Sequence, residues 1–215
     1  MNISILVSDP KHPVNASLKE WRDIMVGFGH NVSIYHRKSE LIGGDILFLI
    51  SCSEIICADV KKKFRASLVI HGSNLPKGRG WSPHIWSILS GDNVIDVCLL
   101  EAAEPVDTGA IWLKDKFYLE GYELLQEINQ KFFEVELRLM SRAVDEFDSI
   151  IPIPQTGDFE TYCKRRTPED SKLDPYKNIA EQFDLLRVVD SERYPAFFEY
   201  RGRKFRLKIE EMEHG

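Results

Sequence analysis

The segment that decides the fold reads Ser67-Leu68-Val69-Ile70-His71-Gly72-Ser73-Asn74-Leu75-Pro76-Lys77-Gly78-Arg79-Gly80-Trp81-Ser82-Pro83. Its first four residues form a short, mostly apolar run that is typical of a buried strand, and His71 ends that run. Three glycines and a proline then predict an irregular loop that carries two cations. Ser82 followed by Pro83 is typical of the start of a helix. The segment therefore predicts a strand, a histidine at its carboxyl end, a cationic glycine-rich loop and a helix.

Similar strand patterns recur along the first half of the chain and alternate with helical ones. We expect helices at 15–28 and 58–64, and strands at 3–7, 31–35, 45–50, 67–70 and 94–100. This alternation predicts an α/β fold, namely a Rossmann-like, open and mostly parallel sheet with helices on both faces. The turn after the first strand contains no glycine, so the Gly-x-Gly-x-x-Gly fingerprint of a dinucleotide site is missing.

The domain boundary is expected after a long helix. An apolar stripe over 122–147 predicts one core-facing helix, and the two prolines and the glycine within 150–157 break that pattern. We therefore expect a main domain over 1–149 and a small subdomain over 150–215. A piece of about 60 residues buries too little surface to be stable alone, so it should pack on the main domain.

The subdomain itself has a mixed α+β pattern. Asn178 and Glu181 resemble a capping box that opens a helix reaching residue 189. The runs 196–200 and 203–209 flank Arg201-Gly202 and predict a β-hairpin.

Composition and charge narrow the class of protein. The chain has 215 residues, 43% of them hydrophobic and 29% charged, which supports a folded core and argues against disorder. With 28 Lys and Arg against 34 Asp and Glu the net charge is −6, so bulk charge does not favour nucleic acid. No apolar run spans a membrane, and the four cysteines form no C-x-x-C pair. We expect a cytoplasmic protein that needs no membrane, nucleic acid or metal.

The candidate chemistry lies at the carboxyl ends of two strands. Ligands of open α/β sheets bind outside such ends, where His71 meets a loop bearing Lys77 and Arg79. If the strand at 94–100 lies beside that of His71, Asp107 of the turn Asp107-Thr108-Gly109 meets the imidazole at the same sheet edge and orients it. The alternatives are a histidine bonded to backbone, cations that are solvated surface charge, and an aspartate that only caps a turn.

The pattern resembles a known family. His71-Gly72-Ser73, then Leu75-Pro76-Lys77, Arg79-Gly80, Ser82-Pro83 and Asp107-Thr108-Gly109 are similar to the motifs of the folate-dependent formyltransferases over about residues 1–125. The resemblance implies that the main domain is catalytic. It also implies that 10-formyltetrahydrofolate is the formyl donor and that a primary amine is the acceptor.

A narrower resemblance concerns the acceptor. Gly78-Arg79-Gly80-Trp81-Ser82-Pro83 followed by 165–174 (RRTPEDSKLD) and 194–200 (YPAFFEY) is similar to the formyltransferases of amino-sugar nucleotides, and among them to those of nonulosonic (pseudaminic-type) acid pathways. This implies a UDP-linked amino-deoxysugar as acceptor, such as a UDP-4-amino-4,6-dideoxy-2-acetamido sugar. The segment 194–200 could equally cover the cleft or form a homodimer contact.

The resemblance also assigns roles to the catalytic residues. His71 donates to the oxyanion of the tetrahedral intermediate and helps proton transfer, and Asp107 orients His71. The family asparagine that usually stands two residues before the histidine is replaced by Val69, which cannot donate a hydrogen bond. Asn74 is the candidate replacement, with capping of the loop as its alternative.

Further positions follow from the resemblance for the two ligands. The folate is expected beside residues that follow two strands: Leu49, Ser51, Cys52, Leu100, Glu101 and Ala103. The acceptor side comprises Lys77, Arg79 and Trp81, joined by Arg165 and Arg166 if the C-terminal piece folds back over the cleft; otherwise these two arginines are surface charge.

Three functions are weighed: sugar-nucleotide formylation, formylation of glycinamide ribonucleotide or methionyl-tRNA, and a catalytically silent formyltransferase-like binding protein. The missing asparagine is the only feature that favours the last, and the intact His71, Asp107 and cationic loop argue against it. The acidic charge and the chain length disfavour tRNA.

Overall fold

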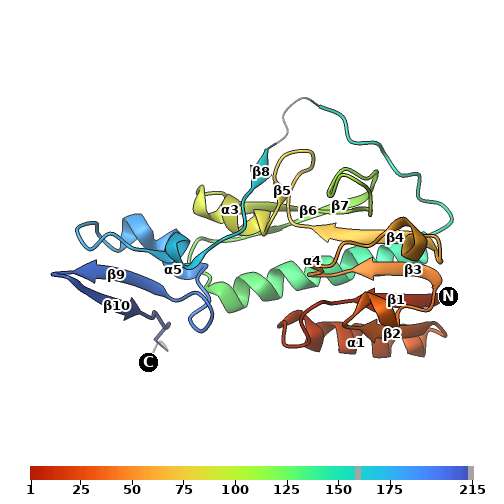
Figure 1. The fold of residues 1–215 in the computed structure, drawn as a ribbon, viewed down its shortest axis with the longest axis horizontal. Helices are drawn as coiled ribbons and strands as arrows, with labels where there is room; N and C mark the ends of the chain where they lie inside the picture. The colour runs from red at the N-terminus through yellow and green to blue at the C-terminus, as the bar shows by residue number, and fades with distance from the viewer. Residues whose placement is uncertain (158–160, 213–215) are drawn as a thin grey trace.

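The computed structural model describes residues 1–157 and 161–212, and its centre is a six-stranded sheet (Figure 1). The strands are β1 (Asn2–Leu6), β2 (Asn31–Tyr35), β3 (Gly44–Leu49), β4 (Phe64–His71), β6 (Val94–Glu101) and β7 (Ile111–Tyr118). Their order is β2-β1-β3-β4-β6-β7. The first four run parallel, and β6 and β7 each pair antiparallel with the preceding strand. The expected α/β fold with a mostly parallel sheet is confirmed.

The edge strand β7 has no counterpart among the expected strands. Ile111, Leu113 and Phe117 are buried, whereas Lys114 and Tyr118 are exposed. Charged side chains are common on edge strands because they discourage pairing with other chains. In β7 the charged side chains interrupt the apolar run, and such runs are what identify the other strands in the sequence.

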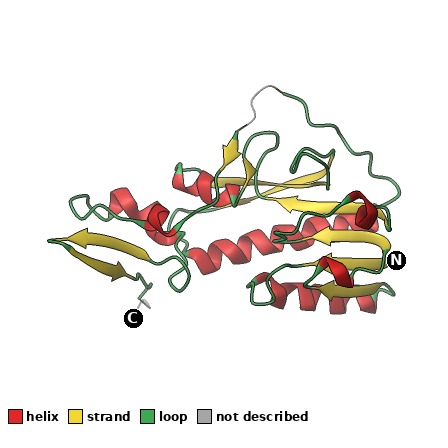
Figure 2. Cartoon of the chain, in the orientation of Figure 1, coloured by secondary structure: helices red, strands yellow, loops and turns green. Residues whose placement is uncertain are grey.

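Helices cover the two faces of the sheet unequally (Figure 2). They are α1 (Val14–Gly27), α2 (Ala58–Lys61), α3 (Pro83–Leu89) and α4 (Leu125–Asp145). Apolar side chains of α1, α3 and α4 share one large core with the side chains of one sheet face. The alternate side chains of the strands enter smaller clusters together with Val60 of α2 and with Cys52, Leu75 and Ala102. Loops that follow β3, β4 and β6 therefore cover much of the second face.

The C-terminal part returns to the loop after β4 before it projects away from the six-stranded sheet. Strand β8 (Tyr162–Cys163) pairs in parallel with β5 (Arg79–Gly80). The 3-10 helices η2 (Pro168–Ser171) and η3 (Ala180–Gln182), the helix α5 (Phe183–Arg187) and the hairpin β9 (Ala196–Tyr200) and β10 (Arg203–Leu207) follow. The predicted hairpin is confirmed, and Figure 1 shows it at the end of the molecule away from the six-stranded sheet.

The helix expected to reach residue 189 is shorter than predicted. The capping pair is present, because the backbone N–H of Glu181 donates to Asn178 Oδ1 at 2.9 Å. The side chain of Gln182, however, bonds to backbone groups of Asp174 and Lys177. Such side-chain bonds compete with helical backbone bonds, and the segment folds as η3 followed by the five-residue α5.

A buried ion-pair network joins α5 to the main domain. Arg187 and Glu123 are each about 1% exposed, and Arg187 also bonds to Asp184 and Asn93. Burial raises the pKa of Glu123, but hydrogen bonds from Lys131 and from backbone N–H groups outweigh burial and lower that pKa to about 2. The carboxylate is therefore charged at neutral pH and serves as an anchor for the C-terminal part.

Candidate active site

The centre of the site is a buried imidazole–carboxylate pair. His71 is the last residue of β4, and Asp107 lies in the loop between β6 and β7. His71 Nδ1 and Asp107 Oδ1 are 3.6 Å apart, and the two residues are 6% and 8% exposed. The expected meeting of these two side chains is observed. Their burial weakens solvent screening and strengthens the electrostatic coupling between them.

The route by which the pair forms differs from the expectation. β4 and β6 are neighbours, but they are antiparallel, and the carboxyl end of β6 at Glu101 lies beside Leu68. The strand ends alone therefore do not bring the residues together. Instead the loop 102–110 places Asp107, whose φ of 62° is in the left-handed region that Asp tolerates better than most residues.

The glycine-rich loop wraps the histidine. His71 Nε2 donates to the Gly78 carbonyl oxygen at 2.8 Å, and because a carbonyl only accepts, Nε2 carries a proton. The N–H of Gly80 donates to Asp107 Oδ2 at 2.9 Å. Gly78 and Gly80 have φ values of 79° and 97°, and a Cβ on Gly80 would meet the Cys163 carbonyl oxygen. The two glycines allow one short loop to contact both members of the pair.

A neighbouring histidine adds no charge to this site. The His84 ring of α3 stacks on Phe132 with the ring centroids 4.5 Å apart, and it lies against Gly72. Burial lowers the pKa of His84 to about 3, with smaller contributions from His71 and His12. His84 is therefore neutral at physiological pH, and its uncharged ring lies beside the segment that follows β4.

The C-terminal part folds back onto the cationic loop, as the acceptor expectation requires. The N–H groups of Arg79 and Trp81 donate to the carbonyls of Thr161 and Cys163 at 2.9 Å each. The Arg165 guanidinium lies 4.9 Å from the centre of the Trp81 ring, a cation–π distance. Trp81 and Arg165 thus share one surface, and the exposed Lys77 is on the same loop. The Arg79 side chain is half-buried and bonds to Gln155 Oε1.

Arg166 is placed differently from its neighbour. Its guanidinium donates to the carbonyls of Val188 and Asp170 and to Ser171 Oγ at 3.3–3.4 Å. Burial lowers the pKa of Arg166, and Asp170 opposes that effect. The structure brings Arg166 to the interior of the C-terminal part and does not bring it to the glycine-rich loop.

Asn74 is also away from the pair in this structure. Its side chain is exposed, and its Oδ1 accepts from Lys114 Nζ of β7 at 2.7 Å. Val69, which stands where the family motif has asparagine, is half-buried and packs with apolar side chains of both clusters on the second sheet face. Val69 therefore contributes packing and no polar group to the site.

The residues expected beside the folate fall into two groups. Leu49 and Cys52 join the apolar cluster that also contains Val69 and Ala102, and Leu100 lies in the adjoining cluster. Ser51 is exposed with φ of 45°, Glu101 Oε1 accepts from Trp112 Nε1 at 3.2 Å, and Ala103 is half-buried. Most of these positions surround one apolar region, whereas the Glu101 side chain turns to β7.

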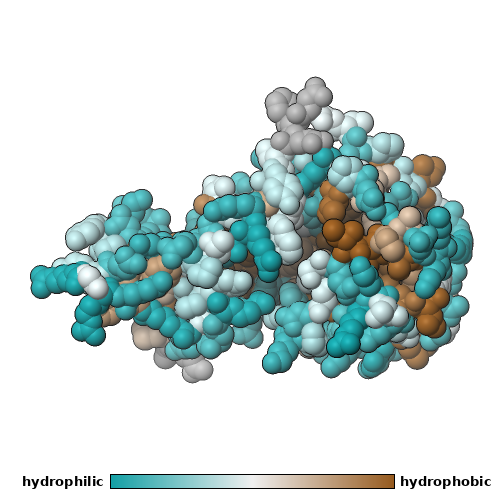
Figure 3. All heavy atoms as spheres, in the orientation of Figure 1, coloured by the Kyte–Doolittle hydropathy of each residue, from teal (hydrophilic) through white to brown (hydrophobic). Residues whose placement is uncertain are grey.

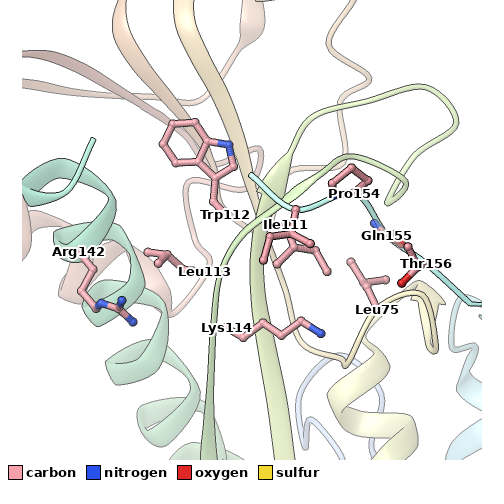
Figure 4. Close-up of a pocket in the computed structure, with 10 residues that line it drawn as sticks. Leu75, Ile111, Trp112, Leu113, Lys114, Arg142, Pro154, Gln155 and Thr156 are labelled. Carbon is pink, nitrogen blue, oxygen red and sulfur yellow. The ribbon is translucent and has the colours of Figure 1, made fainter. Parts of the chain in front are cut away.

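A cavity of about 430 Å³ lies next to this site, between β7, α4 and the segment 153–156 (Figure 4). It is lined by residues that include Trp112, Lys114, Arg142 and Gln155, and neither His71 nor Asp107 lines it. Gln155 bonds to the backbone of Asp107 and to Arg79, and Thr161 Oγ1 accepts from the N–H of Gly78 at 2.8 Å. Neither residue can be recognised from the sequence, because no local pattern marks Gln155 or Thr161.

Two negative findings hold for residues 1–157 and 161–212. None of the helices there combines the length and the apolar character that crossing a bilayer needs. No group of three or more His, Cys, Asp or Glu side chains in those residues is arranged to hold a metal ion.

The comparison with protein families settles the class of this chain. Residues 33–144, which contain both His71 and Asp107, match the family model described as formyl transferase. The chain belongs to the formyl transferase family. Formyl transferases of this family are folate-dependent enzymes.

The chain is similar to individual members of the formyl transferase family as well. A methionyl-tRNA formyltransferase of Rickettsia felis is 31% identical over 175 residues, which are 80% of this chain and 56% of that protein. The chain thus spans little more than half the length of that relative.

Solved structures share the fold. A methionyl-tRNA formyltransferase from Clostridium thermocellum has a TM-score of 0.83 at 24% identity, covering 99% of this chain and 94% of the other. A 4-N formyltransferase from Francisella tularensis has a TM-score of 0.78 at 17% identity, covering 99% and 98%.

Proposed function

We propose that this protein transfers a formyl group from 10-formyltetrahydrofolate to the primary amine of a UDP-linked amino-deoxysugar. The observation that carries the proposal is the buried pair of His71 and Asp107 beneath a cationic, glycine-rich loop. Formyl transfer to an amine passes through a tetrahedral oxyanion and must remove a proton from the attacking nitrogen. A buried hydrogen-bond donor oriented by a carboxylate serves both needs.

The proposed chemistry assigns separate tasks to the two residues. The neutral amine attacks the formyl carbon, and the Nε2–H of His71 stabilises the oxygen that becomes negative. Asp107 orients the imidazole and relays the amine's proton to N10 of the folate. The intermediate then collapses, the bond between N10 and the formyl carbon breaks, and tetrahydrofolate leaves. In the structure the Gly78 carbonyl accepts that Nε2–H, so the proposal requires substrate binding to displace this carbonyl. The glycines of the loop make such a movement easy.

The folate is proposed to lie against the apolar region around Leu49, Ser51, Cys52 and Leu100–Ala103. Ile55 and Val106, on the loops after β3 and β6, are 68% and 61% exposed, and they offer apolar surface to a flat pterin ring. Figure 3 shows that hydrophobic surface gathers over the sheet end of the molecule, and that the C-terminal part is mostly hydrophilic on the same face.

Asn74 stays in the proposal as a candidate amide donor. Its Oδ1 is bonded to Lys114, so the role requires its Nδ2 group. The alternative is that Asn74 only fixes the loop to β7. The turnover of the variant Asn74→Ala distinguishes the two roles.

The acceptor is proposed to bind over Lys77, Arg79, Trp81 and Arg165. Cations suit a diphosphate, and an exposed indole can stack on a base or sugar. The Francisella protein, a 4-N formyltransferase, supports a 4-amino sugar such as a UDP-4-amino-4,6-dideoxy-2-acetamido sugar. In this proposal residues 1–149 form the catalytic domain, and the subdomain 150–215 supplies Arg165 to its surface.

A second candidate is formylation of methionyl-tRNA. The Rickettsia and Clostridium relatives, both described as methionyl-tRNA formyltransferases, favour it. The net charge of −6 speaks against it, because tRNA binding depends on neutralising phosphates.

The test offers the purified protein 10-formyltetrahydrofolate with three acceptors in parallel: a panel of UDP-4-amino-deoxysugars, charged initiator tRNA and glycinamide ribonucleotide. Formylation of a UDP-amino sugar, absent from the variant His71→Ala, is the expected result. Formylation of tRNA or glycinamide ribonucleotide alone would overturn the sugar assignment. Folate binding without transfer to any acceptor would favour a silent binding protein.

A further inference from the structure

Gln155 connects the two loops that build the catalytic pair. Its Nε2 group donates to the carbonyl oxygens of Asp107 at 2.8 Å and of Gly109 at 2.9 Å. Its Oε1 accepts from a terminal nitrogen of Arg79 at 3.0 Å. One half-buried amide therefore holds the turn that carries the carboxylate and the loop that carries the acceptor-side cations. Figure 4 shows the place of Gln155 between Pro154 and Thr156.

The Asp107 turn depends on such anchoring. Asp107 has a φ of 62°, and its carboxylate is fixed at one oxygen by the N–H of Gly80. That bond holds the side chain and leaves the orientation of the peptide unit to other groups. Gln155 supplies them from the backbone side, because both of its N–H groups point at carbonyls of this turn.

The segment that carries Gln155 is itself tied to the main domain. Ile153 pairs with Ile111 of β7 through two backbone bonds of 2.8 Å. Further along the chain, Thr161 Oγ1 accepts a hydrogen bond from the N–H of Gly78. Gln155 thus lies two residues from a backbone bridge to β7, and this bridge holds its segment beside the site.

We propose that Gln155 is a positioning residue for formyl transfer, setting the orientation of the Asp107 carboxylate against His71. The inference rests on the proposed function. Gln155 touches Asp107 and Arg79 and contacts His71 through neither of its polar atoms, so it acts through Asp107. Its loss should lower turnover more than it lowers the binding of folate.

Two isosteric variants separate the contacts of the amide. Gln155→Glu keeps an oxygen for Arg79 but turns a negative oxygen toward the carbonyls of Asp107 and Gly109. Gln155→Met keeps the side-chain length and removes every hydrogen bond. Gln130→Met is the matched control, because Gln130 is an exposed glutamine on α4 whose side chain bonds to Glu134 on the same helix.

Kinetics with 10-formyltetrahydrofolate and the accepted amine provide the first readout. We expect both Gln155 variants to lower kcat by about 10- to 100-fold, the effect of a small misplacement of catalytic groups. KM for the folate should stay within about threefold of wild type. The melting temperature should fall by about 2–4 °C, and Gln130→Met should match wild type.

Wild-type kcat in both variants would overturn the proposal. So would a fall in kcat accompanied by a loss of melting temperature above about 10 °C, because that would show a scaffold role.

A second readout does not depend on turnover. The ring-proton chemical shifts of His71 are compared by NMR at pH 7 in the wild type, Gln155→Met and Asp107→Asn. A positioning role predicts that Gln155→Met moves these shifts toward those of Asp107→Asn, and unchanged shifts would overturn it. This readout decides the inference even if the wild-type protein formylates no amine, a result that would defeat only the proposed function.

Discussion

The clearest stability prediction concerns a buried carboxyl group on α4. Glu136 is 2% exposed, lies among apolar side chains of the main core, and has Oε2 without a hydrogen-bond partner. Burial raises the pKa of Glu136 to about 8. In the folded protein the group is therefore neutral at pH 7, whereas in the unfolded chain, at its ordinary value of 4.5, it is ionised.

The sign of the effect follows from these two values. The folded state holds the proton more tightly than the unfolded state, so Glu136 costs stability as the pH rises from about 4.5 to about 8. Each pH unit in that interval costs about 1.4 kcal/mol. The cost is about 1 kcal/mol at pH 5 and about 3 kcal/mol at pH 7.

Glu136→Gln removes this titration while it keeps the shape of the side chain. We expect urea unfolding to show a gain in the free energy of unfolding that is about 2 kcal/mol larger at pH 7 than at pH 5. The control is Glu134→Gln, an exposed position two residues away on the same helix, whose effect should not change with pH. An equal gain in the free energy of unfolding at pH 5 and pH 7 would refute the reasoning. Such a gain would come from packing or hydrogen bonding alone, because only the titration of Glu136 depends on pH.

Three further predictions address the site and the anchor of the C-terminal part. His71→Ala and Asp107→Asn should each lower kcat for formyl transfer by about 10²- to 10³-fold with an unchanged circular dichroism spectrum, and normal turnover in either would remove that residue from the mechanism. Asn74→Ala should lower turnover at least about tenfold if its amide donates to the oxyanion, and wild-type turnover would leave it the loop-fixing role. Arg187→Met should lower the free energy of unfolding by about 3 kcal/mol in urea, because it leaves the buried Glu123 with one partner fewer; a loss under about 1 kcal/mol would contradict the anchoring role.

The parallel half of the sheet could be predicted because its strands leave a continuous signal. β3 is buried on both faces from Ile46 to Leu49, and β4 is buried on one face and partly covered on the other, so their apolar runs stand out against the polar loops. β7 could not be found in this way, because Lys114 and Lys116 on its open side break the run. The helix at α5 is shorter than its sequence pattern predicts. Gln182 bonds to the backbone of Asp174, eight residues earlier, and these competing bonds depend on the position of that loop in the folded chain.

The sequence by itself determined the residue types of the candidate site. Each part of the site is a local pattern that can be recognised within about a dozen residues. These patterns are a histidine that ends an apolar strand, a glycine-rich loop with two cations, and an Asp-Thr-Gly turn. The tertiary structure decided how these parts meet. β6 runs antiparallel to β4, so a loop and not a strand end delivers Asp107 to His71. Gln155 bonds to Asp107 across 48 residues, and Thr161 bonds to Gly78 across 83. A hydrogen bond between segments so far apart leaves no periodicity in either one, and only the folded chain shows it.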